Sequence, residues 1–197
     1  MGTNGIDVSE WQHGTNITKM PGLDFVIAKA CQGSTSGGGF EDPVYGEWAE
    51  QAEAAGAHFG AYCYFRPELL NARAQADYFC SIARPRSGLS LWIDYETYGI
   101  SGQHDAEEIG FFAAEVKRNT GNKAKIGIYY NDFGLSRIQP YLSEIPYSAL
   151  WNADPGRGMT VQNPALAWQV HQYEVLDDID RNYSTWSHAD WESFWAW

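Results

Sequence analysis

The chain has 197 residues, 44% of them hydrophobic, which is enough to bury a sizeable core, and we expect a single domain over residues 1–197. Its formal net charge of −12, with only 13 Lys and Arg residues, excludes electrostatic attraction to nucleic acid. No run approaches the ~18 apolar residues of a membrane span, and residues 1–11 lack the basic and apolar regions of a signal peptide.

Short apolar runs alternate with helical patterns along most of the chain. Pro43 and Gly56 bound the first expected helix, and Asn71 is a candidate N-cap of the second. The expected helices span residues 43–56, 71–83 and 105–121, with a short one around 133–142. Residues 5–12 are expected to form a strand that runs into a loop after Asp7. The other expected strands span residues 24–33, 58–67, 89–96, 125–131, 147–154, 164–173 and 178–182.

Strands separated by helices indicate a parallel sheet. About eight strands suit a closed β/α barrel, but a barrel with a helix after every strand typically takes ~250 residues. The last three expected strands follow one another with little helix between them. We therefore predict an α/β fold, an irregular β/α barrel of about eight strands with helix-poor final strands. In such barrels the site lies at the carboxyl ends of the strands.

The strand at residues 89–96, "LSLWIDYE", ends in two carboxylates. Side chains alternate along a strand, so Asp94 and Glu96 project to one face while Ile93 and Tyr95 project to the other. A solvated strand end is the ordinary interpretation, because acids are seldom buried. The alternative is a paired-acid active site, which requires matching groups at the ends of other strands.

Acids, amides and aromatic rings do end the other expected strands. The acids are Asp7 after the first strand and Asp180 in the last, and the chain is rich in rings, with 9 Trp, 12 Tyr and 9 Phe. The candidate substrate-binding residues are Trp11, Tyr62, Tyr64, Tyr129, Trp151, Gln172, Tyr173 and Asn182. Flat amphipathic rings among acids and amides suit a sugar chain. The set therefore favours the active-site interpretation of Asp94 and Glu96.

We expect structural roles for the three cysteines and for His171. Cys31, Cys63 and Cys80 are an odd number in apolar contexts, which favours core residues over a disulfide framework. No His or Cys lies around them at zinc-like spacing, so no metal site is expected. His171 is expected to be a strand residue that points away from the site.

An ordered series of motifs resembles glycoside hydrolase family 25, the Chalaropsis-type lysozymes (N-acetylmuramidases) found among phage endolysins and bacterial autolysins. The motifs are "GIDVSEWQ", "FVIAKACQG", "GAYCYFRP", "ARAQADYF", "LWIDYE", "IGIYYN", "LWNAD" and "QY…DIDRN". They run from about residue 5 to residue 183. The resemblance implies five β/α pairs followed by strands without helices. It also implies cleavage of the β-1,4 bond between N-acetylmuramic acid and N-acetylglucosamine with net retention, and no metal or organic cofactor.

Carried over residue by residue, the resemblance makes Glu96 the general acid and Asp94 its partner carboxylate, with Asp7 and Asp180 as two further acidic site residues. Repulsion among these acids and partial burial should raise one pKa, and Glu96 is the expected proton holder. Asp94 acts either as a nucleophile or by orienting the substrate's 2-acetamido group for attack. The second route is favoured.

Some points stay open at this stage. The loop "QGSTSGGGFEDP" is rich in Gly, so its ligand contacts are undefined. Gln169 and Gln172 both offer a match to a Gln-Tyr pair of the family, and Gln172 is favoured because Tyr173 follows it. The aromatic residues of "HADWESFWAW" are expected to cover a barrel surface. The alternatives to a muramidase are an inactive carbohydrate-binding barrel and a glycosidase on another N-acetylated polymer such as chitin.

The expected partner is the glycan strand of bacterial peptidoglycan, bound by a monomer acting on the cell wall. Without a visible signal peptide, we expect release through a membrane pore, as for a phage enzyme, or another non-classical route.

Overall fold

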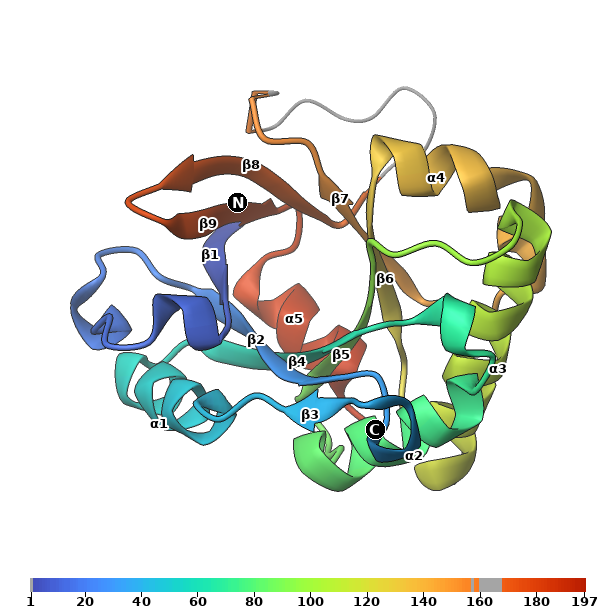
Figure 1. Cartoon of the computed structure of the whole chain (residues 1–197). Helices are drawn as coiled ribbons and strands as arrows, with labels where there is room; N and C mark the ends of the chain where they lie inside the picture. Colours follow the sequence, from blue (N-terminus) through green and yellow to red (C-terminus); the bar gives the residue numbers. More distant parts are fainter. Residues whose placement is uncertain (1, 157, 160–167) are drawn as a thin grey trace.

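Eight strands close into a barrel in the computed structural model, which describes residues 2–156, 158–159 and 168–197 (Figure 1). The order around the barrel is β1-β9-β8-β7-β6-β5-β4-β2, and β2 closes the ring by pairing with β1. The strands are β1 (Thr3–Val8), β2 (Phe25–Gln32), β4 (His58–Tyr64), β5 (Ser90–Tyr95), β6 (Gly127–Asn131), β7 (Ala149–Ala153), β8 (Val170–Leu176) and β9 (Ile179–Ser184). A two-residue strand that the sequence did not predict, β3 (Phe40–Glu41), extends the edge of β2. The predicted irregular β/α barrel is confirmed.

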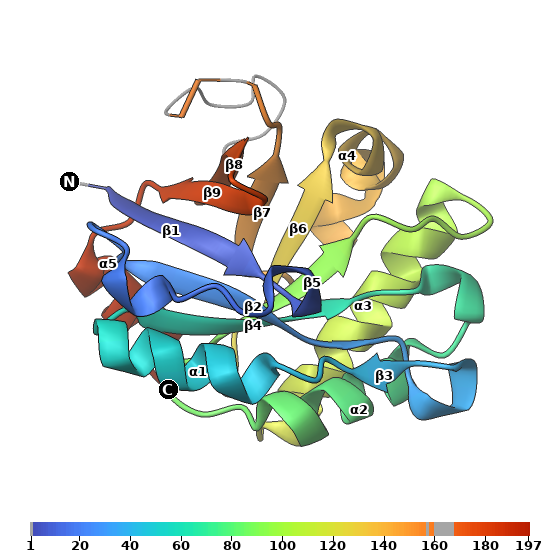
Figure 2. The same cartoon turned by 60° about the vertical axis from the view of Figure 1, so that its left-hand side comes forward.

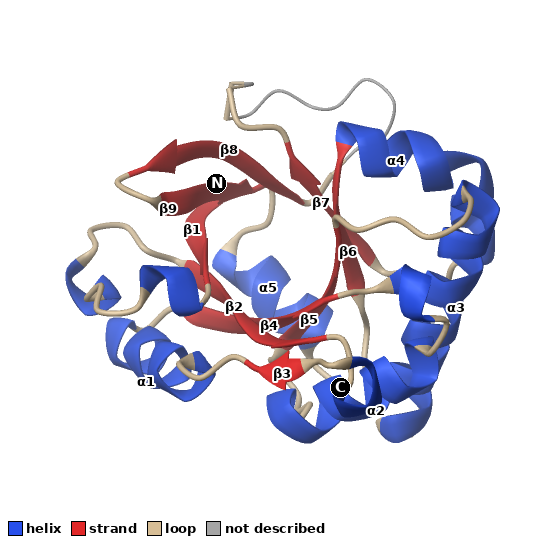
Figure 3. Cartoon of the chain, in the orientation of Figure 1, coloured by secondary structure: helices blue, strands red, loops and turns tan. Residues whose placement is uncertain are grey.

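The main helices lie outside the ring of strands (Figure 3). They are α1 (Tyr45–Ala55), α2 (Ala72–Ala83), α3 (Gly102–Asn119) and α4 (Asp132–Ile138). After β1 the chain forms only the 3-10 helices Glu10–Gln12 and Ile17–Lys19, where the sequence predicted a loop after the first strand. Further 3-10 helices span Thr35–Gly37, Pro67–Leu69 and Gln139–Glu144.

Helix boundaries follow the local capping chemistry. Gly56 ends α1 with a φ of 69°, a left-handed conformation that glycine adopts without strain. The third helix begins at Gly102, three residues before the predicted start, because the Ser101 side chain accepts a hydrogen bond from the His104 backbone N–H. Asn71 does occupy the N-cap position of α2, but its side chain makes no capping bond.

The last strand departs from the predicted parallel sheet. β9 runs antiparallel to both of its neighbours, β8 and β1. Asp177 and Asp178, with φ angles of 53° and 60°, form the two-residue turn that reverses the chain after β8. Asp180 therefore lies at the beginning of its strand, yet at the same rim as the carboxyl ends of the parallel strands.

Two apolar layers hold the barrel together. The outer layer packs the barrel against α1, α2 and α3, and it includes Ile93 and Phe112. The inner layer fills the barrel with large side chains such as Phe25, Trp92 and Trp151. These rings need small neighbours, since a Cβ added at Gly127 would lie 2.2 Å from the Trp92 ring.

A C-terminal helix closes the amino end of the barrel. In Figure 2 this helix, α5 (His188–Trp195), lies at the end where β1 begins. Trp191 and Trp195 enter the inner layer, and Trp191 Nε1 donates to Thr3 Oγ1 at 2.9 Å. The aromatic tail thus covers the barrel as predicted, but it does so as an unpredicted helix, whose capping box is formed by Ser187 and Asp190. None of the described helices is long and apolar enough to cross a membrane.

Candidate active site

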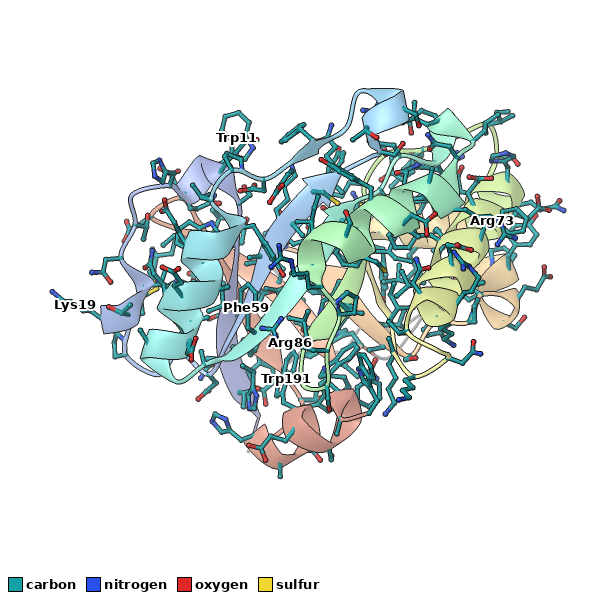
Figure 4. The ribbon with its side chains drawn as sticks, turned by 90° about the horizontal axis from the view of Figure 1, so that it is seen from below. Trp11, Lys19, Phe59, Arg73, Arg86 and Trp191 are labelled. Carbon is teal, nitrogen blue, oxygen red and sulfur yellow. The ribbon has the colours of Figure 1, made fainter. Side chains whose placement is uncertain are left out.

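A pocket of about 260 Å³ opens at the carboxyl ends of the parallel strands, as the barrel geometry requires. It contains all four predicted acids and six of the eight predicted substrate-binding residues. Its full lining is Asp7, Val8, Ser9, Trp11, Gln12, Lys29, Tyr62, Tyr64, Asp94, Glu96, Tyr129, Trp151, Gln172 and Asp180. Trp11, with 81% of its surface exposed, projects from the rim at the end of the molecule opposite Trp191 (Figure 4).

The end of β5 delivers both members of the paired acids, as its alternation predicted. Asp94 is 7% exposed, and Glu96 follows the strand directly. Ile93 packs in the outer layer, and the Tyr95 hydroxyl donates to Asp105 Oδ2 at 2.6 Å outside the barrel. The pleat of the strand therefore separates the acids from the residues that hold it to α3.

A buried ion pair anchors the loop that follows Glu96. Arg137 donates to Asp105 Oδ2 from Nε at 2.9 Å and from a terminal nitrogen at 2.8 Å. The other oxygen of this fully buried carboxylate accepts from the Gly99 backbone N–H at 2.8 Å. These bonds hold Gly99, three residues after Glu96, against Asp105 of α3 and Arg137 of α4.

The antiparallel turn places Asp180 beside Asp7, because the two residues are direct partners in the β1–β9 register. Asn182, two residues further along β9, lies under them and is 1% exposed. Its Nδ2 donates to Asp7 Oδ2 at 2.7 Å, and its Oδ1 accepts from Trp151 Nε1 at 2.8 Å. Asn182 is thus outside the pocket lining and holds Asp7 from below.

A hydrogen-bonded chain of side chains links Glu96 to Asp180. The Tyr129 hydroxyl donates to Gln172 Oε1 at 2.7 Å, and it also contacts the Glu96 carboxyl group. Gln172 in turn hydrogen-bonds the Asp180 side chain. Because the Tyr129 hydroxyl has a single proton, it can donate either to Gln172 or to the ionised Glu96 carboxylate.

Burial raises the pKa of all four acids. For Asp7 it acts together with repulsion from Asp180, and for Asp94 with repulsion from Glu96 and Asp7. The pKa of Glu96 is raised by burial and by Asp180, although its hydrogen bond with Tyr129 opposes the rise. Burial likewise raises the pKa of Asp180, against its bond with Gln172. The upward shift that the sequence assigned to one acid is thus shared, and it is strong at Asp7 and Asp94.

Lys29 brings a positive charge into this acidic pocket, and it was not among the predicted site residues. Its side chain is only 6% exposed, and its charge lowers the pKa of Asp94 and of Glu96, against the larger effect of burial. A β-bulge after Lys29 shifts the register of β2 against β4. The alternation from Phe25 through Ile27 points Lys29 into the barrel, and this was the signal that could have identified it.

Besides Asn182, Tyr173 is the predicted substrate-binding residue that does not line the pocket. A bulge between Gln172 and Glu174 interrupts the β8–β9 register at this residue. Tyr173 shares the outer side of β8 with His171, their ring centroids lying 6.4 Å apart, and it lines a separate hollow beside Asn4. Gln172 alone faces the pocket from this strand.

The remaining sequence candidates lie away from the pocket. Gln169 accepts a hydrogen bond from the Leu150 backbone N–H at 2.8 Å, and fully buried His171 packs against Trp168. The cysteines are free, with Cys31 and Cys63 buried and Cys80 half-buried. Within residues 2–156, 158–159 and 168–197, no group of three or more His, Cys, Asp or Glu side chains is arranged to hold a metal ion.

Comparison with known proteins gives one consistent family. The family model "Glycosyl hydrolases family 25" matches residues 6–179, a range that includes Asp7, Asp94 and Glu96 and ends one residue before Asp180. Lysozyme M1 of Streptomyces globisporus is 28% identical over 209 aligned positions, covering 92% of this chain and 67% of that protein.

Solved structures agree in fold. The bacterial lysozyme from Streptomyces coelicolor superposes with a TM-score of 0.81 at 26% identity, covering 99% of this chain and 97% of that one. The family GH25 lysozyme from Aspergillus fumigatus gives a TM-score of 0.83 over 100% of both chains, and at 19% identity it supports the fold alone.

Proposed function

The chain belongs to glycosyl hydrolases family 25, and we propose that it cleaves the β-1,4 bond between N-acetylmuramic acid and N-acetylglucosamine in peptidoglycan, with net retention. In this proposal residues 1–197 act as one catalytic domain on the bacterial cell wall. The observation that carries it is the meeting of Asp94 and Glu96 with Asp7 and Asp180 in a single pocket lined by aromatic rings.

Glu96 is the proposed general acid and base. It is half-buried at the end of β5, its pKa is raised, and Tyr129 contacts its carboxyl group. A carboxyl whose pKa is raised keeps its proton to a higher pH than an ordinary Glu side chain, and the protonated form can donate to the leaving glycosidic oxygen. The same group, once ionised, can take a proton from the water that completes hydrolysis.

Asp94 is the proposed partner in a substrate-assisted reaction. Its Oδ1 is buried and has no hydrogen-bond partner among the described residues, so it is free to accept the N–H of a 2-acetamido group. The acetamide oxygen then bonds to the anomeric carbon as the glycosidic bond breaks and Glu96 gives its proton to the leaving oxygen. Water afterwards attacks the anomeric carbon, breaks the new carbon–oxygen bond and returns a proton to Glu96.

Product analysis tests the bond specificity and the role of Glu96 together. Soluble products from purified peptidoglycan would be reduced with borohydride and identified by mass spectrometry, for the wild type and for Glu96→Gln. We expect reduced muramic acid at the new ends and at least a ~10³-fold lower rate for the variant, since Gln cannot supply a proton. Reduced glucosamine ends would instead identify a glucosaminidase, and no products on several wall types would indicate a binding barrel.

The pH dependence of kcat/KM tests the proton on Glu96. The acid must be protonated in the free enzyme, so activity should fall as pH rises through its raised pKa. The alkaline limb should therefore lie above the 4.5 of an ordinary Glu side chain. A flat profile from pH 4 to pH 9 would argue against this assignment.

Two inhibitors separate the possible roles of Asp94. A thiazoline analogue of the cyclised 2-acetamido sugar should inhibit competitively if the substrate assists. A 2-deoxy-2-fluoro muramyl glycoside with a good leaving group lacks the acetamide, and it should leave no covalent adduct. An adduct on Asp94, seen by intact-protein mass spectrometry, would assign Asp94 as the nucleophile instead.

A further inference from the structure

A second groove of about 480 Å³ continues from the catalytic pocket across the ends of β2 and β4. The pocket and the groove share Trp11, Lys29 and Tyr64, so a ligand can extend from one into the other. Gln32 and Arg66 lie on the groove's far side. The catalytic mechanism proposed above uses none of the groups that belong to the groove alone.

The balance of charges in the groove differs from that in the pocket. The pocket holds four carboxyl groups and Lys29, whereas the groove is lined by Lys29 and Arg66 with Glu10 as its one acid, and Glu68 pairs with Arg66 from outside the lining. This grouping of cations stands out in a chain whose net charge is −12. These cations would add little to the binding of an uncharged polymer, but they would attract an anionic substituent to this side of the pocket.

The ammonium group of Lys29 makes fewer hydrogen bonds than its three N–H donors allow. Its ammonium makes one long hydrogen bond, to Gln32 Oε1 at 3.4 Å, and otherwise lies over the rings of Phe40 and Tyr64, at 5.1 and 5.4 Å from their centroids. No carboxylate of the described chain lies within ion-pair distance of it. A buried ammonium has three donors and is costly to leave unsatisfied, so the groove is suited to an anion.

Arg66 is held in place at the other side of the groove. Its backbone N–H donates to Gln75 Oε1 at 3.0 Å, and its carbonyl accepts from Gln75 Nε2 at 2.8 Å. Its Nε pairs with Glu68, and the described residues offer no hydrogen bond to its two terminal nitrogens. Those nitrogens form a planar pair that suits a carboxylate.

We propose that this groove binds the carboxylate-bearing substituent on O3 of the muramic acid sugar, with Lys29 and Arg66 as its cationic anchors. The inference rests on the proposed muramidase function and adds to it a basis for specificity. Chitin carries a free hydroxyl at O3 and would leave Lys29 and the two terminal nitrogens of Arg66 without an anion. The carboxylate can come from the lactyl group itself in a peptide-free strand, or from the peptide stem in an intact one.

Three substrates test the proposal by kcat/KM, measured from the release of reducing ends. They are peptide-bearing glycan strands, peptide-free strands with free lactyl carboxylates, and peptide-free strands whose lactyl carboxylates have been converted to neutral methylamides. The variants are Arg66→Gln, Arg66→Lys and the control Arg86→Gln. Arg86 is an exposed arginine that lies toward the α5 side of the molecule, away from Trp11 (Figure 4).

We expect the wild type to favour a carboxylate-bearing strand over the neutral strand by about tenfold, as one charge-assisted contact can provide. Arg66→Gln should lose most of this preference through a higher KM, Arg66→Lys should keep part of it, and Arg86→Gln should match the wild type. A preference already present with free lactyl carboxylates assigns the groove to the lactyl group. A preference confined to peptide-bearing strands assigns it to the stem. Both outcomes support the proposal.

Equal rates on all three substrates for the wild type, or an equal loss on all three for Arg66→Gln, would overturn it. The Arg66 side chain is 32% exposed, so its replacement should leave folding intact, and thermal midpoints would verify this. Failure of the wild type to release products from any strand would overturn the proposed function itself, an outcome distinct from cleavage without charge preference.

Discussion

At the scale of single residues, the pocket concentrates carboxyl groups whose environment opposes their ionisation. Burial raises the pKa of Asp7, Asp94, Glu96 and Asp180, and mutual repulsion adds to the effect at most of them. Such a site is useful because it keeps a proton available for transfer. It also costs stability, since the unfolded chain ionises these groups more easily.

Asp94→Asn should therefore stabilise the protein while reducing activity. An acid with a raised pKa binds its proton more tightly in the folded state than in the unfolded state. Its contribution to the free energy of unfolding is therefore most favourable below the unfolded pKa near 3.8, and it is lost as pH rises to the folded pKa. We expect a gain of about 1 kcal/mol in the free energy of unfolding at pH 7 that disappears near pH 3. Urea denaturation at both pH values measures it.

The matched control for this comparison is Glu50→Gln, which neutralises an exposed acid on α1. It should change the free energy of unfolding by less than about 0.5 kcal/mol at either pH. Equal gains for Glu50→Gln and Asp94→Asn would mean that overall charge, and not the pocket, controls the effect.

At the scale of elements, the barrel is built differently at its two ends. The carboxyl end is polar and open, whereas the amino end is sealed by the aromatic side chains of α5. Trp191 is 2% exposed, and its ring packs at a tilt against Phe25 with the centroids 4.8 Å apart. Its indole N–H reaches the first residue of β1, so α5 links the C-terminal segment of the chain to the N-terminal strand.

Trp191→Ala should destabilise the barrel without changing the chemistry. We expect a loss of about 3 kcal/mol in the free energy of unfolding, from lost burial and the cavity left behind. Because the pocket lies at the other end, kcat/KM well below the thermal midpoint should stay within about twofold of wild type. Calorimetry and a product assay measure the two quantities, with exposed Glu192→Ala as the control. A large drop in kcat/KM at full folding would show coupling between the ends.

At the scale of the whole molecule, the net charge of −12 opposes approach to any anionic surface. Lys29 and Arg66 are an exception that lies inside the groove, so they act on bound substrate and not on the distant approach. The screening length falls from ~30 Å at 0.01 M to ~8 Å at 0.15 M ionic strength. Long-range repulsion should therefore be strong in dilute buffer and weak at physiological salt.

Cell walls that retain anionic polymers should consequently be degraded several-fold faster at ~0.15 M than at ~0.01 M ionic strength. Walls stripped of those polymers should show a much smaller increase. Turbidity loss on paired wall preparations measures the ratio. Identical salt dependence on both preparations would mean that long-range repulsion does not limit the enzyme.

The sequence predicted those features that depend on neighbouring residues. The period of two along residues 89–96 placed Asp94 and Glu96 on one face, and most helices and strands followed from local apolar patterns and caps. Several expected strands end in acids or aromatic rings, which predicted that these side chains would meet at one rim. Ten of the twelve predicted side chains do line one pocket there.

Only the tertiary structure decided the remainder, because it depends on register and packing between distant segments. The turn at Asp177 and Asp178 reverses β9 and brings Asp180 beside Asp7, which lies 173 residues earlier in the chain. Asn182 beneath the acids and Tyr173 beyond the pocket follow from that register and its bulge. Local periodicity does not specify the register between strands or the position of a bulge. The kinds of side chain at the site could therefore be predicted from the sequence, whereas the partners of each acid could not.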